Sequence, residues 1–377
     1  MQELRLENKI FTSTLYTLYG ILITYPLIFL EIYAYQLSGI IAAVMIYSIS
    51  SLAMGIAPLL VAPLSDRTGY RLRYAILAIL VGSIFLLAST LVEQVSLVIV
   101  LMIIGSAILQ IGQPLFIAFE TERREKVGRS VGDVYLFINL GYFIGSVVYG
   151  YFIEILSFKV TSISTSLIGV VISTLFLPMK ENRIHSDGSK HLKIWDTLKS
   201  MDKVIVFSSI LAFGPALVYS IIPIYYTNLL RGGVLDWGVV NAFATLIGIF
   251  VSPYVGKLID SIGIRMTLAI GAAYYPIYYL SIILYPNTIF FAIIYALPFW
   301  LFVWIPLFTL PALYSTNEER ARKVSSMNFS IDVFRALGGV AGGSLYYLLD
   351  PYTFIIISAL ISTILPIFSL QTIKLKK

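Results

Sequence analysis

The sequence predicts an all-α polytopic membrane protein with twelve transmembrane helices, arranged as two six-helix bundles. Three observations lead to this fold class: the composition, the apolar runs, and a charged turn that occurs twice. Of the 377 residues, 58% are hydrophobic and 12% are charged, and the mean hydropathy is +0.89. Soluble domains have about 45–50% apolar and about 25% charged residues. The chain therefore has too few polar residues to cover a soluble globule.

The apolar runs define the predicted elements. A membrane helix needs roughly 20 predominantly apolar residues. Runs of this length occur at 11–35, 40–62, 72–91, 95–119, 131–156, 160–178, 204–228, 236–258, 266–285, 288–314, 325–348 and 352–371. Most connections are short, so consecutive helices are expected to be antiparallel. The polar segment 179–203 is the exception, and it divides the chain into an N-terminal bundle (1–178) and a C-terminal bundle (204–377).

The segment 179–203 has a pattern of its own. Every third residue is apolar at Leu192, Trp195, Leu198 and Met201, with lysines between them. This spacing is typical of a short amphipathic helix on the cytoplasmic membrane surface. A plain connector is the alternative.

Lysines and arginines predict the orientation. With the N-terminus in the cytoplasm, all but three of the 26 basic residues fall on the cytoplasmic side, as membrane proteins generally require. The exceptions are Lys159, Arg231 and Arg335, and the last lies within a predicted helix. The basic excess is thus a topology signal, and no nucleic-acid partner is expected. We expect a monomeric integral protein of the plasma membrane with both termini in the cytoplasm.

Several function classes are excluded. The chain has no cysteine, so disulfides, thiol catalysis and cysteine-ligated metals are ruled out. Both histidines, His185 and His191, lie in the central polar segment, and no HExxH zinc motif occurs. No G-x-x-x-x-G-K-[ST] phosphate-binding loop is present, so ATP is not the expected energy source. We expect neither an enzyme nor a bound cofactor or metal.

A charged turn follows both the second and the eighth predicted helix. The first copy reads Ala62-Pro-Leu-Ser-Asp66-Arg67-Thr-Gly69-Tyr-Arg71, and the second reads Gly256-Lys-Leu-Ile-Asp260-Ser-Ile-Gly263-Ile-Arg265. The fifth and eleventh predicted helices also match, through Gly141 and Gly145 in one and Gly338 and Gly342 in the other. These repeats indicate a duplicated bundle, and two bundles about a central site are a common transporter architecture.

Twelve helices in two halves, with this turn in these two loops, resemble the major facilitator superfamily. The family's loop pattern is roughly G-x-L-x-D-R-x-G-R-[RK]. The first copy departs from it at Ala62 and Tyr70, and the second has Ser261 in place of the arginine. The resemblance covers the whole chain. It implies alternating access, with a cytoplasmic latch formed by Asp66, Arg67, Gly69, Arg71, Glu120, Asp260, Gly263 and Arg265. A solvated topology loop without a gating role is the alternative.

Glycines in the fifth predicted helix provide a clue to the direction of transport. Gly132, Gly141, Gly145 and Gly150 resemble a family pattern associated with exporters, although Ser146 replaces its proline. The basic residue that many drug antiporters carry in the fourth helix is missing, which argues against proton-coupled drug antiport. Small residues allow close helix packing, whether static or at a moving interface. We assign this role to Gly132, Gly141, Gly145, Gly338 and Gly342.

Ionisable groups inside a membrane are costly and are functional candidates. Asp332 and Arg335 lie one turn apart and share a helix face. Arg335 is roughly 15 Å into its helix at 1.5 Å per residue. The pair is predicted to bind a charged substrate group or carry a coupling proton, or else to form a self-neutralised structural pair. Glu31, in the outer third of the first helix, is either a proton site or a rim residue.

Uncharged polar and aromatic residues complete the candidates for a substrate path. The polar ones are Gln110, Gln113, Asn139 and Asn241, and the family's path-lining helices favour the two glutamines. Trp300 and Trp304 lie at i and i+4, where they could stack on a sugar or aromatic solute or pack against lipid. The tyrosines at 274, 275, 278 and 279 are expected in a lipid-facing belt. Pro26, Pro223 and Pro298 are expected to kink their helices.

Together these features predict a secondary active transporter for a small organic solute. Its partners would be the solute and the lipid bilayer, with protons as the candidate coupling ion and export as the favoured direction. A lipid or amphiphile flippase of the same fold is one alternative. A non-transporting membrane sensor is an alternative from a different class.

Overall fold

The computed structural model describes residues 2–123, 127–177, 181, 201–313 and 320–372, and within these ranges all regular structure is helical. Some side chains inside the ranges, among them those of Asp66 and Arg67, are outside the description. The amphipathic helix predicted around Trp195 also falls on residues outside it.

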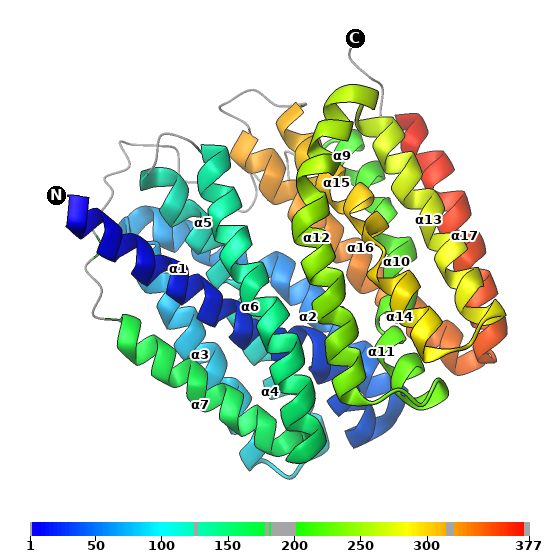
Figure 1. Ribbon diagram of the computed structural model, residues 1–377, viewed down its shortest axis with the longest axis horizontal. Helices are drawn as coiled ribbons and strands as arrows, with labels where there is room; N and C mark the ends of the chain where they lie inside the picture. Colours follow the sequence, from blue (N-terminus) through cyan, green and yellow to red (C-terminus); the bar gives the residue numbers. More distant parts are fainter. Residues whose placement is uncertain (1, 124–126, 178–180, 182–200, 314–319, 373–377) are drawn as a thin grey trace. The chain divides into compact units, whose positions relative to one another are not determined.

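The first half of the chain forms α1 (Gln2–Thr24), the π-helical turn η1 (Tyr25–Phe29), α2 (Leu30–Thr68), α3 (Leu72–Leu91), α4 (Val95–Gln110), α5 (Gly112–Arg123), α6 (Val127–Ile155) and α7 (Phe158–Phe176) (Figure 1). The second half forms α9 (Lys203–Ser209), η2 (Ile210–Ala212), α10 (Phe213–Tyr219), α11 (Ile222–Ile224), η3 (Tyr225–Leu229), α12 (Val234–Ile262), α13 (Ile264–Leu284), α14 (Thr288–Ala296), η4 (Pro298–Trp300), α15 (Leu301–Leu313), α16 (Arg320–Leu348) and α17 (Pro351–Thr372).

The helices are those of an integral membrane protein. Among the described residues, 10 segments are long and apolar enough to cross a membrane. The first, Ile10–Val61, contains two of the predicted helices, because the backbone leaves helical angles at Ser38 and Gly39. α16 is not in that set, but its 29 residues span roughly 44 Å, more than the ~30 Å hydrocarbon core. The structure is therefore consistent with twelve membrane helices.

Three prolines mark breaks in the helices, as expected from the sequence. Pro26 lies within the π-helical turn η1, and Pro223 lies two residues before the π-helical turn η3 begins at Tyr225. Pro298 begins the 3₁₀ turn η4. Proline removes a helical hydrogen bond and pushes its ring against the preceding turn, so the chain adopts wider or tighter turns at these points.

The residues group into two compact units. Unit 1 contains 1–33, 57–191 and 233–246, and unit 2 contains 34–56, 192–232 and 247–377. Each unit therefore includes part of one helix from the other half of the sequence, namely the beginning of α12 in unit 1 and residues 34–56 of α2 in unit 2. The division into bundles at 1–178 and 204–377 remains a prediction about the duplicated sequence.

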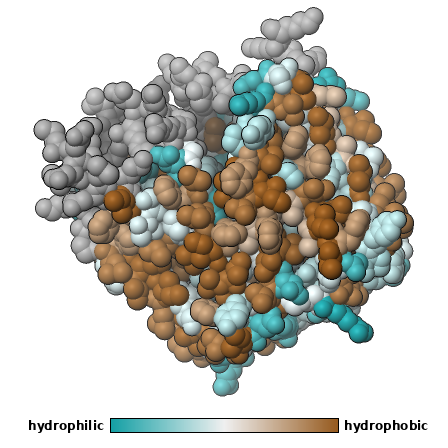
Figure 2. Space-filling model, viewed as in Figure 1, coloured by the Kyte–Doolittle hydropathy of each residue, from teal (hydrophilic) through white to brown (hydrophobic). Residues whose placement is uncertain are grey.

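Apolar side chains both fill the interior and cover the outside. In unit 1, buried residues such as Leu15, Tyr19 and Phe116 form the core between α1, α3 and α5. On the outside, large apolar side chains are widely exposed, including Phe250 at 67% and Leu284 at 71%. Figure 2 shows one face largely covered by hydrophobic side chains. Such a surface is suited to lipid rather than to water.

Candidate functional site

Both charged turns contain a glycine with a positive φ. Gly69 ends α2 with a φ of 73°, and its N–H donates to the Ser65 carbonyl at 2.9 Å. Gly263 separates α12 from α13 with a φ of 86°. Only glycine adopts this conformation readily, so each turn can reverse the chain within a few residues.

The first turn is tied together by its own polar groups. The Ser65 hydroxyl donates to the Tyr70 carbonyl at 2.9 Å, and a guanidinium N–H of Arg71 donates to the Ser65 hydroxyl at 2.9 Å. The side chains of Asp66 and Arg67 are outside the described residues. In the second turn, Asp260 and Arg265 are exposed.

Glu181 closes the first turn, and the sequence reasoning missed it. Its Oε1 accepts the backbone N–H groups of Arg71 at 2.6 Å and Leu72 at 2.9 Å, and its Oε2 accepts that of Arg73 at 3.0 Å. A carboxylate at a helix N-terminus accepts hydrogen bonds from the free N–H groups and interacts favourably with the positive end of the helix dipole. Glu181 thus ties the segment after α7 to the start of α3. About 110 residues separate the partners in sequence, so no local pattern indicates this contact.

Glu120, the predicted acidic partner of the arginines, is buried at 4% exposure near the end of α5. Its Oε1 accepts a hydrogen bond from the Tyr16 hydroxyl at 2.8 Å. The carboxylate is therefore held by α1. Its pairing with the arginine cluster remains a prediction.

Four of the five predicted packing glycines lie at close helix crossings, two within unit 1 and two within unit 2. A Cβ added at Gly141 would lie 2.7 Å from the Gly20 Cα, so α6 crosses α1 at glycine on both helices. A Cβ at Gly338 would lie 2.6 Å from the Phe213 carbonyl oxygen on α10. Gly145 and Gly342 lie at the same two crossings. Gly132 is exposed, and a Cβ there would meet nothing within 4 Å, so it makes no close contact in the described structure.

Asp332 and Arg335 form an ion pair on α16, on one helix face as the spacing predicted. A guanidinium nitrogen of Arg335 lies 3.3 Å from the Asp332 Oδ1, and the side chains are 30% and 16% exposed. Asp332 packs against α2, because a Cβ added at Gly55 would lie 2.9 Å from its Cβ. The pair therefore lies between helices, and each charged side chain remains partly exposed.

Aromatic rings surround this pair. The Arg335 guanidinium carbon lies 5.8 Å from the ring centre of Tyr47 and 5.9 Å from that of Trp304. Tyr219 is also close enough to interact electrostatically with Arg335. Arginine at this distance from a ring face is attracted by the ring quadrupole. Together Asp332, Arg335, Tyr47, Trp304 and Tyr219 are called the Arg335 cluster below.

The tyrosines of α13 correct an expectation. Tyr275, Tyr278 and Tyr279 are buried at 4%, 4% and 1% exposure, so they face the protein rather than lipid. Tyr274 is half-buried, and its ring stacks on Phe299 at 4.7 Å. Tyr275 lies next to Tyr219 and Trp304 and so extends the Arg335 cluster. Hydropathy cannot separate a lipid-facing from a protein-facing aromatic face.

The remaining candidates divide between the units. Trp300 belongs to unit 2, where its ring packs against Gly248. The others belong to unit 1: Glu31, Gln110, Gln113, Asn139 and Asn241. Asn241 donates to the carbonyl of Trp237 in its own helix at 2.8 Å, and Gln113 lies beside Tyr135. Glu31 is buried at 8% exposure.

Comparisons with known proteins agree with this architecture. The sequence profile of the Major Facilitator Superfamily matches residues 10–339. No curated protein sequence matches the chain. The solved nucleoside transporter NupG is similar, with a TM-score of 0.73 at 15% identity over 98% of this chain and 99% of that one.

Two further solved structures have the same fold. A bacterial homolog of the human lysosomal transporter Spinster, inward-facing and occupied, gives a TM-score of 0.70 at 14% identity over 97% of this chain and 96% of that one. A POT family transporter in complex with 5-aminolevulinic acid gives the same TM-score, identity and coverage. At such identities these likenesses establish the fold alone.

Proposed function

Because this chain belongs to the Major Facilitator Superfamily, we propose that it is a secondary active transporter, not an enzyme, that moves a small organic solute by alternating access. We assign contact with the substrate to the Arg335 cluster. This assignment rests on one observation: a partly exposed ion pair lies between aromatic rings, well inside a membrane helix.

The chemistry of the cluster favours a particular kind of solute. A guanidinium has five N–H donors, more than Asp332 and Tyr47 can occupy. About a third of the Arg335 side chain is open, at 30% exposure, so donors remain for a substrate oxygen. Asp332 already offsets the positive charge, which disfavours a substrate with a fixed phosphate-like charge. The rings of Trp304 and Tyr219 suit a flat or sugar-like body.

The coupling and direction are part of the same proposal. Asp332 and the buried Glu31 are the carboxylates best placed to carry a coupling proton. Export is favoured by the glycines of α6, and the two charged turns act as the cytoplasmic latch. The protein works as a monomer in the plasma membrane, with both termini in the cytoplasm and with no nucleic-acid partner.

A ligand-binding panel on purified protein tests the assignment. The compounds are nucleosides, sugars, amino acids including 5-aminolevulinic acid, organic acids and lipids, since the similar structures include a nucleoside transporter and a 5-aminolevulinic acid complex. A ligand at 100 times its Kd stabilises the folded state by about 2.7 kcal/mol. The hit should disappear in Trp304→Ala and persist in Glu93→Gln, which changes an exposed loop. A hit of full strength in Trp304→Ala would refute the site.

Transport assays in proteoliposomes separate the alternatives. A response to lipids alone, with movement of labelled lipid between leaflets, would favour a flippase. Binding without movement of the ligand, with or without a pH gradient, would favour a sensor. Uptake or efflux driven by the pH gradient would support the proposal.

A further inference from the structure

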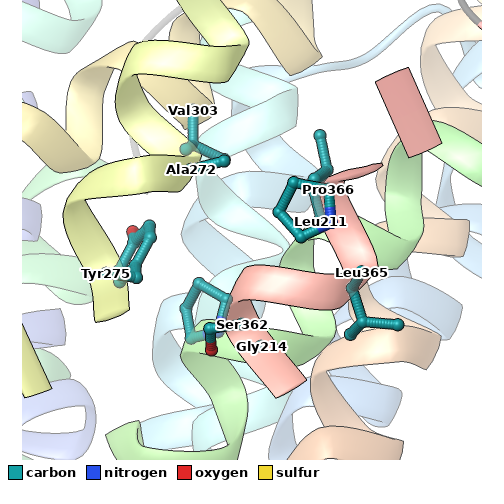
Figure 3. Close-up of a pocket in the computed structure, with 9 residues that line it drawn as sticks. Leu211, Gly214, Ala272, Tyr275, Val303, Ser362, Leu365 and Pro366 are labelled. Atoms are coloured by element: carbon teal, nitrogen blue, oxygen red, sulfur yellow. The ribbon is translucent and has the colours of Figure 1, made fainter. Parts of the chain in front are cut away.

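A small cavity lies among α10, α13, α15 and α17 of unit 2 (Figure 3). It has room for roughly one water molecule. Residues that matter for its chemistry are Leu211, Pro215, Ala272, Tyr275, Ser362 and Pro366. Among the residues that the structure describes, no acidic or basic side chain lines it. Tyr275 lies both at the cavity and beside the Arg335 cluster.

Prolines disturb the backbone hydrogen bonding around this cavity. Three segments, η2 with α10, α13 and α17, each have a proline four residues after a lining residue. These pairs are Leu211 and Pro215, Ala272 and Pro276, and Ser362 and Pro366. Proline has no N–H, so the carbonyl four residues earlier loses its helical donor. The carbonyls of Leu211, Ala272 and Ser362, all lining residues, therefore have no i+4 N–H donor.

Two buried hydroxyl groups at the cavity also require hydrogen-bond partners. Ser362 is 3% exposed and Tyr275 is 4% exposed. Tyr275 lies beside Tyr219 and Trp304, and Ser362 lies beside Tyr279. Among the described residues, however, neither hydroxyl has a partner that meets strict hydrogen-bond geometry. A buried polar group without a hydrogen-bond partner destabilises the folded state. Inside a membrane helix, such groups are usually satisfied by neighbouring helices, hydroxyls or ordered water.

We propose that this cavity is a binding site for one ordered water molecule. The water donates to carbonyls freed by the prolines and accepts from the Ser362 hydroxyl. A bare cation is disfavoured, because no carboxylate lines the cavity and an unpaired buried charge is costly. The water joins α10, α13 and α17 at the level where each lacks a helical hydrogen bond.

Radiolytic hydroxyl-radical labelling of the purified full-length protein tests the proposal, since radicals form from internal water and oxidise the side chains beside it. Tyr278 is the matched control, because it lies one turn from Tyr275 on α13 with the same 4% exposure but does not line the cavity. Tyr275 should be oxidised severalfold faster than Tyr278. Equal rates would overturn the proposal.

Two variants separate this cavity from the Arg335 cluster as the source of the water. Ser362→Val removes a hydroxyl and fills space, and Pro366→Ala gives the Ser362 carbonyl a helical donor again. In both, Tyr275 labelling should fall towards that of Tyr278. Unchanged labelling in both would overturn the proposal, as would wild-type labelling that sodium suppresses and choline does not, since this would indicate a cation.

Discussion

Removing one charge of the ion pair, by Asp332→Asn, gives the sharpest test of its energetics. At 3.3 Å and an effective dielectric constant of about 20, the gross attraction between the charges is about 5 kcal/mol. Breaking a fully buried pair typically costs about 3–5 kcal/mol, because the remaining charge is left uncompensated. Here Arg335 keeps some solvent contact and two aromatic rings, which lower that cost. We therefore expect a loss of about 2–3 kcal/mol in the free energy of unfolding.

The double variant Asp332→Asn with Arg335→Gln provides the control. It removes both charges and keeps polar side chains of similar size, and replacing a whole pair is often nearly neutral. It should therefore be more stable than Asp332→Asn alone. Unfolding of the purified protein in mild detergent, followed by thermal and SDS titration, gives these values. The reasoning fails if the single variant loses less than about 0.5 kcal/mol, the scale of an ordinary surface change. It also fails if the double variant is no more stable than Asp332→Asn alone.

Three further perturbations can be measured in the same unfolding assay. Gly342→Ala puts a methyl group against the backbone of α10 and should destabilise by about 1–3 kcal/mol, whereas Gly132→Ala should not destabilise; equal effects would contradict the close crossing. Glu181→Gln should cost about 1–2 kcal/mol, because a neutral amide accepts the N–H groups at the start of α3 more weakly, and an unchanged stability would show that the contact is unimportant. Partial burial raises the pKa of Asp202, but the Lys323 ammonium 2.8 Å away and the helix N–H groups outweigh this and lower it below the ordinary value. Its stabilisation is therefore present above the unfolded pKa of about 3.9 and is lost as the pH falls through the lower folded pKa. Asp202→Asn should therefore cost up to about 1 kcal/mol at pH 7, with a difference that vanishes in strong acid, and a pH-independent difference would refute the ion-pair explanation.

Part of the candidate site could be predicted from the sequence because its signals are local. Asp332 and Arg335 lie one turn apart, and any helix places such residues on one face. Gly69 and Gly263 recur at the same place in a repeated turn, and both have positive φ. Pro26 and Pro223 lie at or shortly before the π-helical turns, because a missing N–H disturbs a helix wherever it occurs.

Other parts of the site depend on residues far apart in the chain. Tyr47 on α2 and Trp304 on α15 flank Arg335 on α16, and no spacing in the sequence links these three. Glu181 meets the start of α3 across about 110 residues of sequence. The lipid-facing position predicted for Tyr275 was wrong, because apolar and aromatic helix faces can pack either against lipid or against another helix.

The sequence by itself determined the membrane class, the duplicated turns and the orientation expected from the basic residues. These follow from hydropathy and charge, which each short segment carries independently of its neighbours. Only the tertiary structure decided which helix faces meet, and so which rings surround Arg335 and which residues line a cavity. In a bilayer the protein interior and the lipid-facing surface are both apolar, so composition cannot distinguish them. Close packing at small residues such as Gly141 and Gly342 determines which helix faces meet.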